Sequence, residues 1–229
     1  MSWSARLPAE LESNFGLVRI EHRSFFPSGP GALRFLDGVL ANAAADAVLA
    51  IPSTFAFTVQ DVRYAIRDRF GKRAEVAFLA LERRFRELAG ESGRAGKKAE
   101  SAAEAVVRRV VGTAPLLNEV VATQTWLDVL DRLAREEAGQ TFVCAPFIPA
   151  NGYAALYPRA RAARARFTEK IRERAARHRF EWIDAEPAID TAEGGRDACM
   201  LPDLVHRNEL GHDVTLAVVA GRLVHDLRV

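Results

Sequence analysis

The residues best suited to chemistry lie near the carboxyl end of the chain, in LPDLVHRNELGHDVTLAVVAGRLVHDL, residues 201–227. Three of the five histidines occur here, and Asp203 precedes His206 by three residues. An imidazole that takes a proton from a nucleophile must be held in one tautomer, with its second nitrogen facing an anionic acceptor. A carboxylate three residues earlier, in a loop before a helix, can turn back and accept that hydrogen bond. The spacing therefore predicts a general base, His206, which Asp203 orients.

A metal site built from four residues of this segment, Asp203, His206, His212 and Asp213, would use plausible ligand types. However, His206 and His212 are six residues apart across a glycine, which is not a common ligand spacing on a helix. We therefore expect neither a metal nor a cofactor. His212 is expected to begin the last helix and to bond to backbone, and His225 is expected to lie at the surface.

Apolar segments of two lengths alternate along the chain and indicate its secondary structure. Short runs bounded by turn residues predict buried strands over residues 45–53 and 140–149, with weaker candidates over 16–22 and 179–184. Amphipathic patterns predict helices over residues 30–44, 58–71, 115–139, 157–179 and 216–227. Residues 74–88 fit either a strand or a helix. Strands that alternate with helices of ten or more residues predict an α/β fold with a mostly parallel sheet.

A Gly-, Ala- and charge-rich stretch at residues 87–112 interrupts this alternation. We expect a single domain over residues 1–229 in which residues 82–138 form a helical insertion. Such an insertion commonly forms a cap beside the ligand crevice of an open α/β sheet. The alternative is a packed helical layer with no role in recognition.

Composition excludes several classes of protein. Lys and Arg number 32 against 30 Asp and Glu, so the net charge of +2 does not indicate nucleic-acid binding. The basic stretch Arg159–Arg179 is interpreted as the solvated face of an amphipathic helix. No apolar run is long enough to span a membrane, and two cysteines form no disulfide framework. We expect a cytoplasmic protein with a buried free thiol at Cys144. Whether a signal peptide lies upstream of Met1 stays an open question.

The stretch LPDLVHRNELGHDVTLAVVAGRL resembles the closing motif of the SGNH (GDSL-type) hydrolase superfamily, in which Asp-x-x-His precedes Asn, Gly, His and an Ala-rich helix. The resemblance continues backwards through TFVCAPFIP and through the segment that ends in LAIPS. It implies a flavodoxin-like three-layer α/β/α sandwich. It also implies that His206 is the general base and Asp203 its partner.

Further roles follow only from this resemblance. Gly29 falls where the family has an oxyanion-hole N–H. Pro52, Ser53 and Thr54 stand where the family has Gly-x-Asn, so Ser53 and Thr54 become candidates for substrate binding. The family's nucleophile is the serine of a Gly-Asp-Ser motif, which the printed sequence does not contain. Residues 1–16 resemble the helix that follows the motif, so the chain is expected to begin after the catalytic serine.

Two classes of function remain open at this point. The first is an SGNH-type hydrolase of acyl or acetyl esters, with a small-molecule, carbohydrate or lipid ester as substrate, or an acyltransferase with the same triad. The second is a non-catalytic SGNH-like binding protein. Neither predicts a nucleic-acid partner or a membrane span, and the oligomeric state is not predicted.

Overall fold

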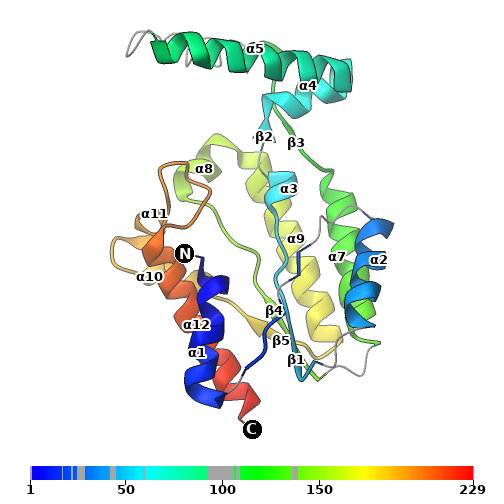
Figure 1. Cartoon of the computed structure of the whole chain (residues 1–229), viewed down its shortest axis with the longest axis vertical. Helices are drawn as coiled ribbons and strands as arrows, with labels where there is room; N and C mark the ends of the chain where they lie inside the picture. Colours follow the sequence, from blue (N-terminus) through cyan, green and yellow to red (C-terminus); the bar gives the residue numbers. More distant parts are fainter. Residues whose placement is uncertain are drawn as a thin grey trace. The chain divides into compact units, whose positions relative to one another are not determined.

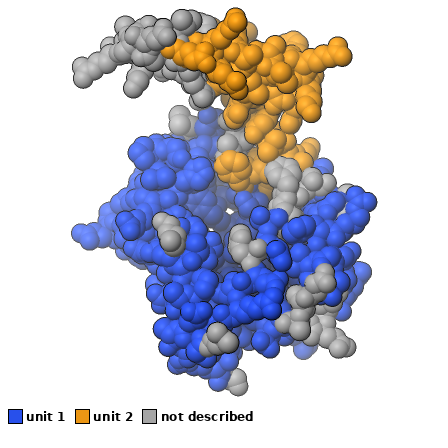
Figure 2. All heavy atoms as spheres, viewed as in Figure 1, with its two compact units in different colours: residues 1–54, 119–229 blue, residues 55–118 orange. Residues whose placement is uncertain are grey.

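The computed structural model describes residues 2–16, 18–21, 23–24, 29–41, 45–58, 60–91, 106, 109–135 and 139–228. The chain divides into two compact units, which Figure 2 colours separately. Unit 1 consists of Met1–Thr54 and Glu119–Val229, and unit 2 consists of Phe55–Asn118.

Unit 1 contains three strands and eight helices among the described residues. The strands are β1 (Ala47–Ala50), β4 (Gln140–Cys144) and β5 (Glu181–Ile183). The helices are α1 (Trp3–Phe15), α2 (Pro30–Leu40), α7 (Glu119–Leu133), α8 (Asn151–Leu156), α9 (Pro158–Arg177), α10 (Glu186–Thr191), α11 (Gly195–Ala198) and α12 (Glu209–Leu227).

The three strands form a parallel sheet in the order β1-β4-β5. Phe142 in the central strand is opposite Leu49 of β1 and Glu181 of β5. Because all three strands run the same way, their carboxyl ends meet at one edge of the sheet. The segments that follow β1, β4 and β5 therefore begin at that shared edge, where ligands of open α/β sheets usually bind.

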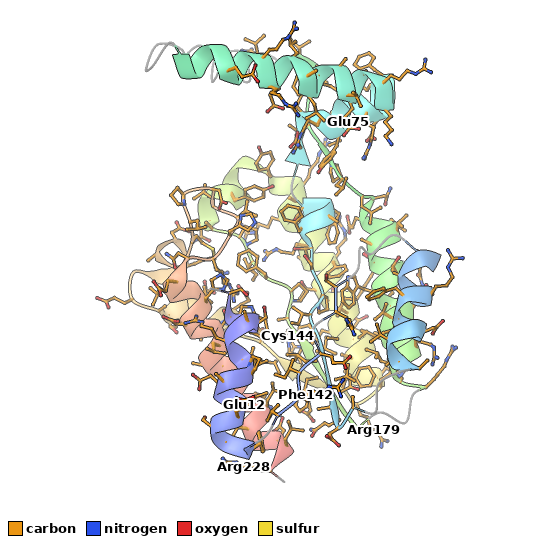
Figure 3. All side chains as sticks on the ribbon, in the orientation of Figure 1. Glu12, Glu75, Phe142, Cys144, Arg179 and Arg228 are labelled. Carbon is orange, nitrogen blue, oxygen red and sulfur yellow. The ribbon has the colours of Figure 1, made fainter. Side chains whose placement is uncertain are left out.

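Helices cover both faces of this sheet (Figure 1). Helices α1 and α12 lie on one side, and α2, α7 and α9 lie on the other. Successive side chains of a strand point to opposite faces, so Phe142 and Cys144 share the face that α1 and α12 cover. Figure 3 labels both residues on the central strand. One core cluster joins them to the two helices: Leu7, Leu11, Phe142, Cys144, Ile183, Leu216, Val219, Ala220 and Leu223. The architecture is a three-layer α/β/α sandwich.

The helices of the second layer bury regular apolar stripes. In α9, Phe167, Ile171 and Ala175 recur every four residues and are each at most 1% exposed. The sequence predicts this stripe from the same spacing, because residues four apart lie on one side of a helix. Most of the basic side chains of this helix, Arg159 and Arg166 among them, are exposed, as predicted.

Unit 2 is a small helical unit. It contains α3 (Phe55–Thr58), α4 (Val62–Phe70), α5 (Lys72–Glu91) and a two-stranded antiparallel sheet of β2 (Gln60–Asp61) and β3 (Ala114–Pro115). The Asp61 carboxylate caps α4 by accepting the Arg63 N–H at 2.8 Å. Residues 74–88, which fit a strand or a helix, lie in α5.

Most of the predicted elements are confirmed, with one exception. Strands occur within residues 45–53, 140–149 and 179–184, and helices occur within the predicted helical ranges. The weak strand predicted over 16–22 is wrong for residues 18–21, which form no strand. Val18 packs against the core cluster while Ile20 is 39% exposed. The apolar run therefore reflects one partly buried loop residue and not a paired strand.

The predicted insertion over residues 82–138 overlaps unit 2 only in part. Helix α7 belongs to unit 1, and unit 2 begins at Phe55. Residues 92–105, 107–108 and 136–138 of the predicted range lie outside the described residues. The bounds of the insertion, its role as a cap and the single-domain organisation stay predictions.

The central position of Phe142 in the core gives a stability prediction. Its side chain is 0% exposed, so Phe142→Ala should lower the free energy of unfolding by about 3–5 kcal/mol through lost transfer energy and a cavity. Phe35→Ala removes the same ring from a site that is 39% exposed and should cost less than half as much. Thermal or urea unfolding of the two variants measures the difference. Equal losses would show that Phe142 is not central to the core.

Candidate functional site

Asp203 and His206 lie in a closed loop between α11 and α12. The His206 carbonyl accepts the Leu201 N–H at 2.8 Å, and the Cys199 carbonyl accepts the Asn208 N–H at 3.0 Å. Met200 and Arg207 also form an antiparallel bridge between these bonds. The two arms of the loop are therefore tied together, and Asp203 lies at the turn that joins them.

The Asp203 carboxylate orders this turn and holds the imidazole. One oxygen, Oδ1, accepts the N–H groups of Val205 and His206, each at 2.9 Å. Side chains of Asp commonly bond to backbone two or three residues later in this way. The other oxygen, Oδ2, lies 2.6 Å from His206 Nδ1. The structure thus brings together the two residues that the sequence predicts to act as a pair.

The protonation of this pair follows from its surroundings. Desolvation alone would raise the pKa of Asp203, but hydrogen bonds from the backbone and imidazole of His206 and from the Val205 N–H lower it to about 2. The carboxylate is therefore ionised near neutral pH and can only accept a hydrogen bond. Nδ1 must then carry the proton, which leaves the lone pair of a neutral ring on Nε2. Since the imidazole is 62% exposed, a substrate can reach the ring from solvent.

Leu204 fixes the loop to the sheet edge. Its φ of 62° lies in the left-handed region, which costs a residue other than glycine about 1–3 kcal/mol. The side chain packs against a second core cluster made of Ala150, Ile189, Cys199 and Met200. Its carbonyl accepts the Ala150 N–H at 3.0 Å. These contacts hold the strained residue and place the loop against the segment that leaves the carboxyl end of β4.

The start of α12 closes the loop from the other side. Asn208 caps the helix by accepting the Gly211 N–H at 3.0 Å, while its amide donates to the Ala198 carbonyl at 2.6 Å. A Cβ at position 211 would overlap the Cys199 carbonyl oxygen. Gly211 is therefore required for close approach of the helix to the loop and not for a left-handed turn.

A buried charge network includes Arg207, the residue that follows His206. Sequence reasoning did not find this network. Glu186 forms ion pairs with both Arg207 and Arg196. The side chains of Glu186, Arg207 and Arg196 are 8%, 8% and 4% exposed. Arg196 also donates to the Ile148 carbonyl at 3.1 Å and pairs with Asp190 at 2.8 Å. The network joins the segments after β4 and β5 to the loop that carries His206.

The remaining histidines of this segment take the expected positions. His212 lies in the first turn of α12, where its Nδ1 accepts the Trp3 N–H at 3.4 Å, and His225 is 74% exposed. Asp213 pairs with Arg6 at 2.5 Å. No group of three or more His, Cys, Asp or Glu side chains in the described part of the chain is arranged to hold a metal ion.

The family resemblance also suggests Gly29, Ser53 and Thr54 as site residues, and the structure describes the surroundings of each. The Gly29 N–H, at a φ of 85°, donates to the Thr125 hydroxyl at 2.9 Å. Ser53 and Thr54 follow β1 at the carboxyl edge of the sheet, where Ser53 is exposed and Thr54 is 4% exposed. Their roles in oxyanion or substrate binding stay predictions.

Cys144 is a free and buried thiol, as predicted. Burial raises its pKa to about 12. A thiol with this pKa carries almost no thiolate near neutral pH, so Cys144 is not a candidate nucleophile.

The fold is similar to that of solved structures. The crystal structure of LAE5, an alpha/beta hydrolase enzyme from the metagenome of Lake Arreo, Spain, matches with a TM-score of 0.54 and 17% identity, over 97% of this chain and 82% of LAE5. A GDSL-like lipase from Bacteroides thetaiotaomicron VPI-5482 matches with a TM-score of 0.42 and 12% identity, over 88% of this chain and 100% of the lipase. No family model and no curated protein matches the sequence. The likeness to LAE5 confirms the α/β fold that the SGNH resemblance implies.

The low pKa of Asp203 predicts how the pair responds to acid. Its carboxylate should stay ionised as the pH falls through 3.8, the ordinary value, and should titrate at about 2. The stabilisation that the ionised group gives the folded chain is therefore complete above 3.8 and is lost between 3.8 and about 2. Carboxyl carbon NMR, with Asp203→Asn to assign the resonance, measures the midpoint. A midpoint near 3.8 would contradict the hydrogen-bonded arrangement.

Proposed function

We propose that this chain carries the acid–base pair of an SGNH-type ester hydrolase, with His206 as general base and Asp203 as the residue that orients it. The observation that supports this most directly is the 2.6 Å bond between His206 Nδ1 and an ionised Asp203, on an exposed ring at the carboxyl edge of a parallel sheet. The closing sequence motif and the hydrolase-like fold agree with it.

The proposed reaction is acyl transfer through a serine. The serine oxygen attacks the ester carbonyl while its proton passes to His206 Nε2, and the resulting imidazolium is stabilised by Asp203. When the tetrahedral intermediate collapses, the bond to the alcohol breaks and His206 returns the proton to the leaving alcohol. Water then attacks the acyl-serine in the same way and releases the acid. If an alcohol replaces water in the second step, the same residues perform an acyl transfer.

The oxyanion site departs from the pattern of the family. The Gly29 N–H donates to the Thr125 hydroxyl, so a developing oxyanion would have to replace that hydroxyl as the acceptor. Thr54 stands where the family carries an Asn amide, and a hydroxyl has a shorter reach. Loss of one oxyanion donor costs about 2.7–4 kcal/mol of transition-state stabilisation. We therefore expect modest rates.

The test compares two histidines of the same segment. Two forms are assayed with p-nitrophenyl acetate. One is the chain of residues 1–229, and the other is extended by translation of the reading frame upstream of Met1. In the form that hydrolyses the ester, His206→Ala should lower kcat on the order of 10⁴-fold, because the base is lost. His225→Ala is the matched control, since that ring is 74% exposed on α12, and it should leave kcat unchanged. An unchanged rate in His206→Ala would refute the role of the base.

The second candidate is a non-catalytic binding protein. Pro52, Ser53 and Thr54 stand in place of Gly-x-Asn, which favours this alternative. It is supported if a serine-directed fluorophosphonate probe labels neither form while an acyl or carbohydrate ligand binds saturably. Labelling of a serine in either form would exclude it.

The substrate class and the cellular location are part of the same proposal. We expect a small-molecule, carbohydrate or lipid ester as substrate and a cytoplasmic protein. In the described part of the chain, none of the helices combines the length and the apolar character that crossing a membrane requires.

A further inference from the structure

We propose that Arg207, clamped by Glu186, is a positioning residue that fixes the geometry of the His206–Asp203 pair. This rests on the proposed function only in so far as His206 acts as a base. The geometric claim concerns the folded protein itself and can be tested without a substrate.

Three contacts hold the buried guanidinium of Arg207, and a fourth holds its backbone. The guanidinium forms an ion pair with Glu186, donates to the Thr215 hydroxyl of α12 and lies 4.7 Å from the ring centre of Phe147, which follows β4. Its backbone also pairs with Met200 across the loop. The side chain is only 8% exposed. Arg207 therefore contacts the segments after β4 and β5, the other arm of the loop, and α12.

Arg207 and His206 are consecutive and share a peptide group, so holding one fixes the other. Their side chains differ sharply in exposure, at 8% for Arg207 and 62% for His206. The loop thus directs the guanidinium inward and the imidazole outward. A shift of Arg207 would move the His206 N–H away from Asp203 Oδ1, where it now lies at 2.9 Å. The same shift would misalign the ring.

Glu186 makes this anchor rigid because it is itself held from two sides. It lies three residues after β5, and the Asp184 carboxylate accepts its backbone N–H at 3.0 Å. Arg196 binds the second oxygen of Glu186 and, through the Ile148 carbonyl, the segment after β4. A carboxylate with one guanidinium on each oxygen has little freedom to move. Through Arg207 and Glu186, His206 is therefore connected to the segments that follow two strands of the sheet, β4 and β5.

A purely stabilising role explains the network less well. Buried ion pairs are often no more stabilising than apolar residues of the same volume, because desolvation opposes the attraction. Here two guanidiniums surround one carboxylate, and the buried Arg207 Nε has no hydrogen-bond partner among the residues described. Such an arrangement is poor as a source of stability. It does fix direction and position, since each bond is directional.

The test replaces Arg207 without leaving an unpaired buried charge. Arg207→Met keeps the length and removes the charge, while Glu186 retains Arg196. Arg222→Met is the matched control, because Arg222 also forms ion pairs, with Glu181 and Asp226, but lies on the exposed side of α12. Carboxyl NMR measures the titration of Asp203, and imidazole NMR detects the His206 Nδ1 proton.

In Arg207→Met we expect the Asp203 midpoint to move from about 2 toward 3.8 and the His206 Nδ1 proton signal to broaden. Arg222→Met should change neither. In a form that hydrolyses esters, kcat should fall on the order of 10²-fold with KM nearly unchanged, as expected for a misplaced catalytic group. Thr215→Val removes one hydrogen bond to Arg207 and should shift the midpoint in the same direction by less.

Folded Arg207→Met or Thr215→Val proteins with the wild-type Asp203 midpoint would overturn the positioning role. If Arg207→Met does not fold, Thr215→Val decides the question, because it keeps the volume and the ion pair. An unchanged rate in His206→Ala together with a shifted midpoint in Arg207→Met would instead refute the hydrolase proposal and leave the positioning role intact.

Discussion

The carboxylate of Glu186 is the point at which the candidate site is joined to the sheet. Its two oxygens bind Arg207, next to His206, and Arg196, which bonds to the segment after β4. Without this buried carboxylate, two guanidiniums would face each other in a region that excludes water, at a cost of several kcal/mol. The Asp203–His206 pair is largely exposed and could not hold its geometry by burial. The rigid part of the site is therefore the layer beneath the residues proposed to do the chemistry.

The sheet gives this layer its position. Three parallel strands end at one edge, and the segments that leave β4 and β5 supply Phe147, Ile148 and Glu186 within a few residues of the strand ends. The core cluster around Phe142 and Cys144 holds α12 against the sheet. Helix α12 in turn presents Asn208, its cap, and Thr215 to the loop. Local order at the imidazole thus depends on long-range packing far from it.

The sequence allowed prediction of features that depend on period and spacing, and it failed where contacts are long-range. The stripe at Phe167, Ile171 and Ala175 follows from periodicity, because burial of a regular helix repeats regularly. The strand at 140–144 follows from a short apolar run bounded by turn residues. The bond between Asp203 and His206 follows from a spacing of three residues in a turn. Glu186 and Arg207 are 21 residues apart, and nothing in the spacing of an acid and a base so far apart indicates that they meet. The short apolar run around Val18 and Ile20 misled because so few apolar residues do not separate a strand from a loop that packs one side chain against the core.

The chemistry of the pair is set by which nitrogen carries the proton. An Asp203 carboxylate with a pKa of about 2 cannot donate a hydrogen bond near neutral pH. The carboxylate therefore fixes the proton of the imidazole on Nδ1, and the substrate does not decide which nitrogen carries it. Two backbone N–H groups at Oδ1 stabilise the ionised carboxylate, and the positive charge of a protonated imidazole stabilises it further. The ring can therefore accept a proton at Nε2 and release it again without a change of tautomer. That property is what the proposed acyl transfer would require of a base that must also act as an acid, and it comes from four consecutive residues, Asp203 to His206, held at both ends.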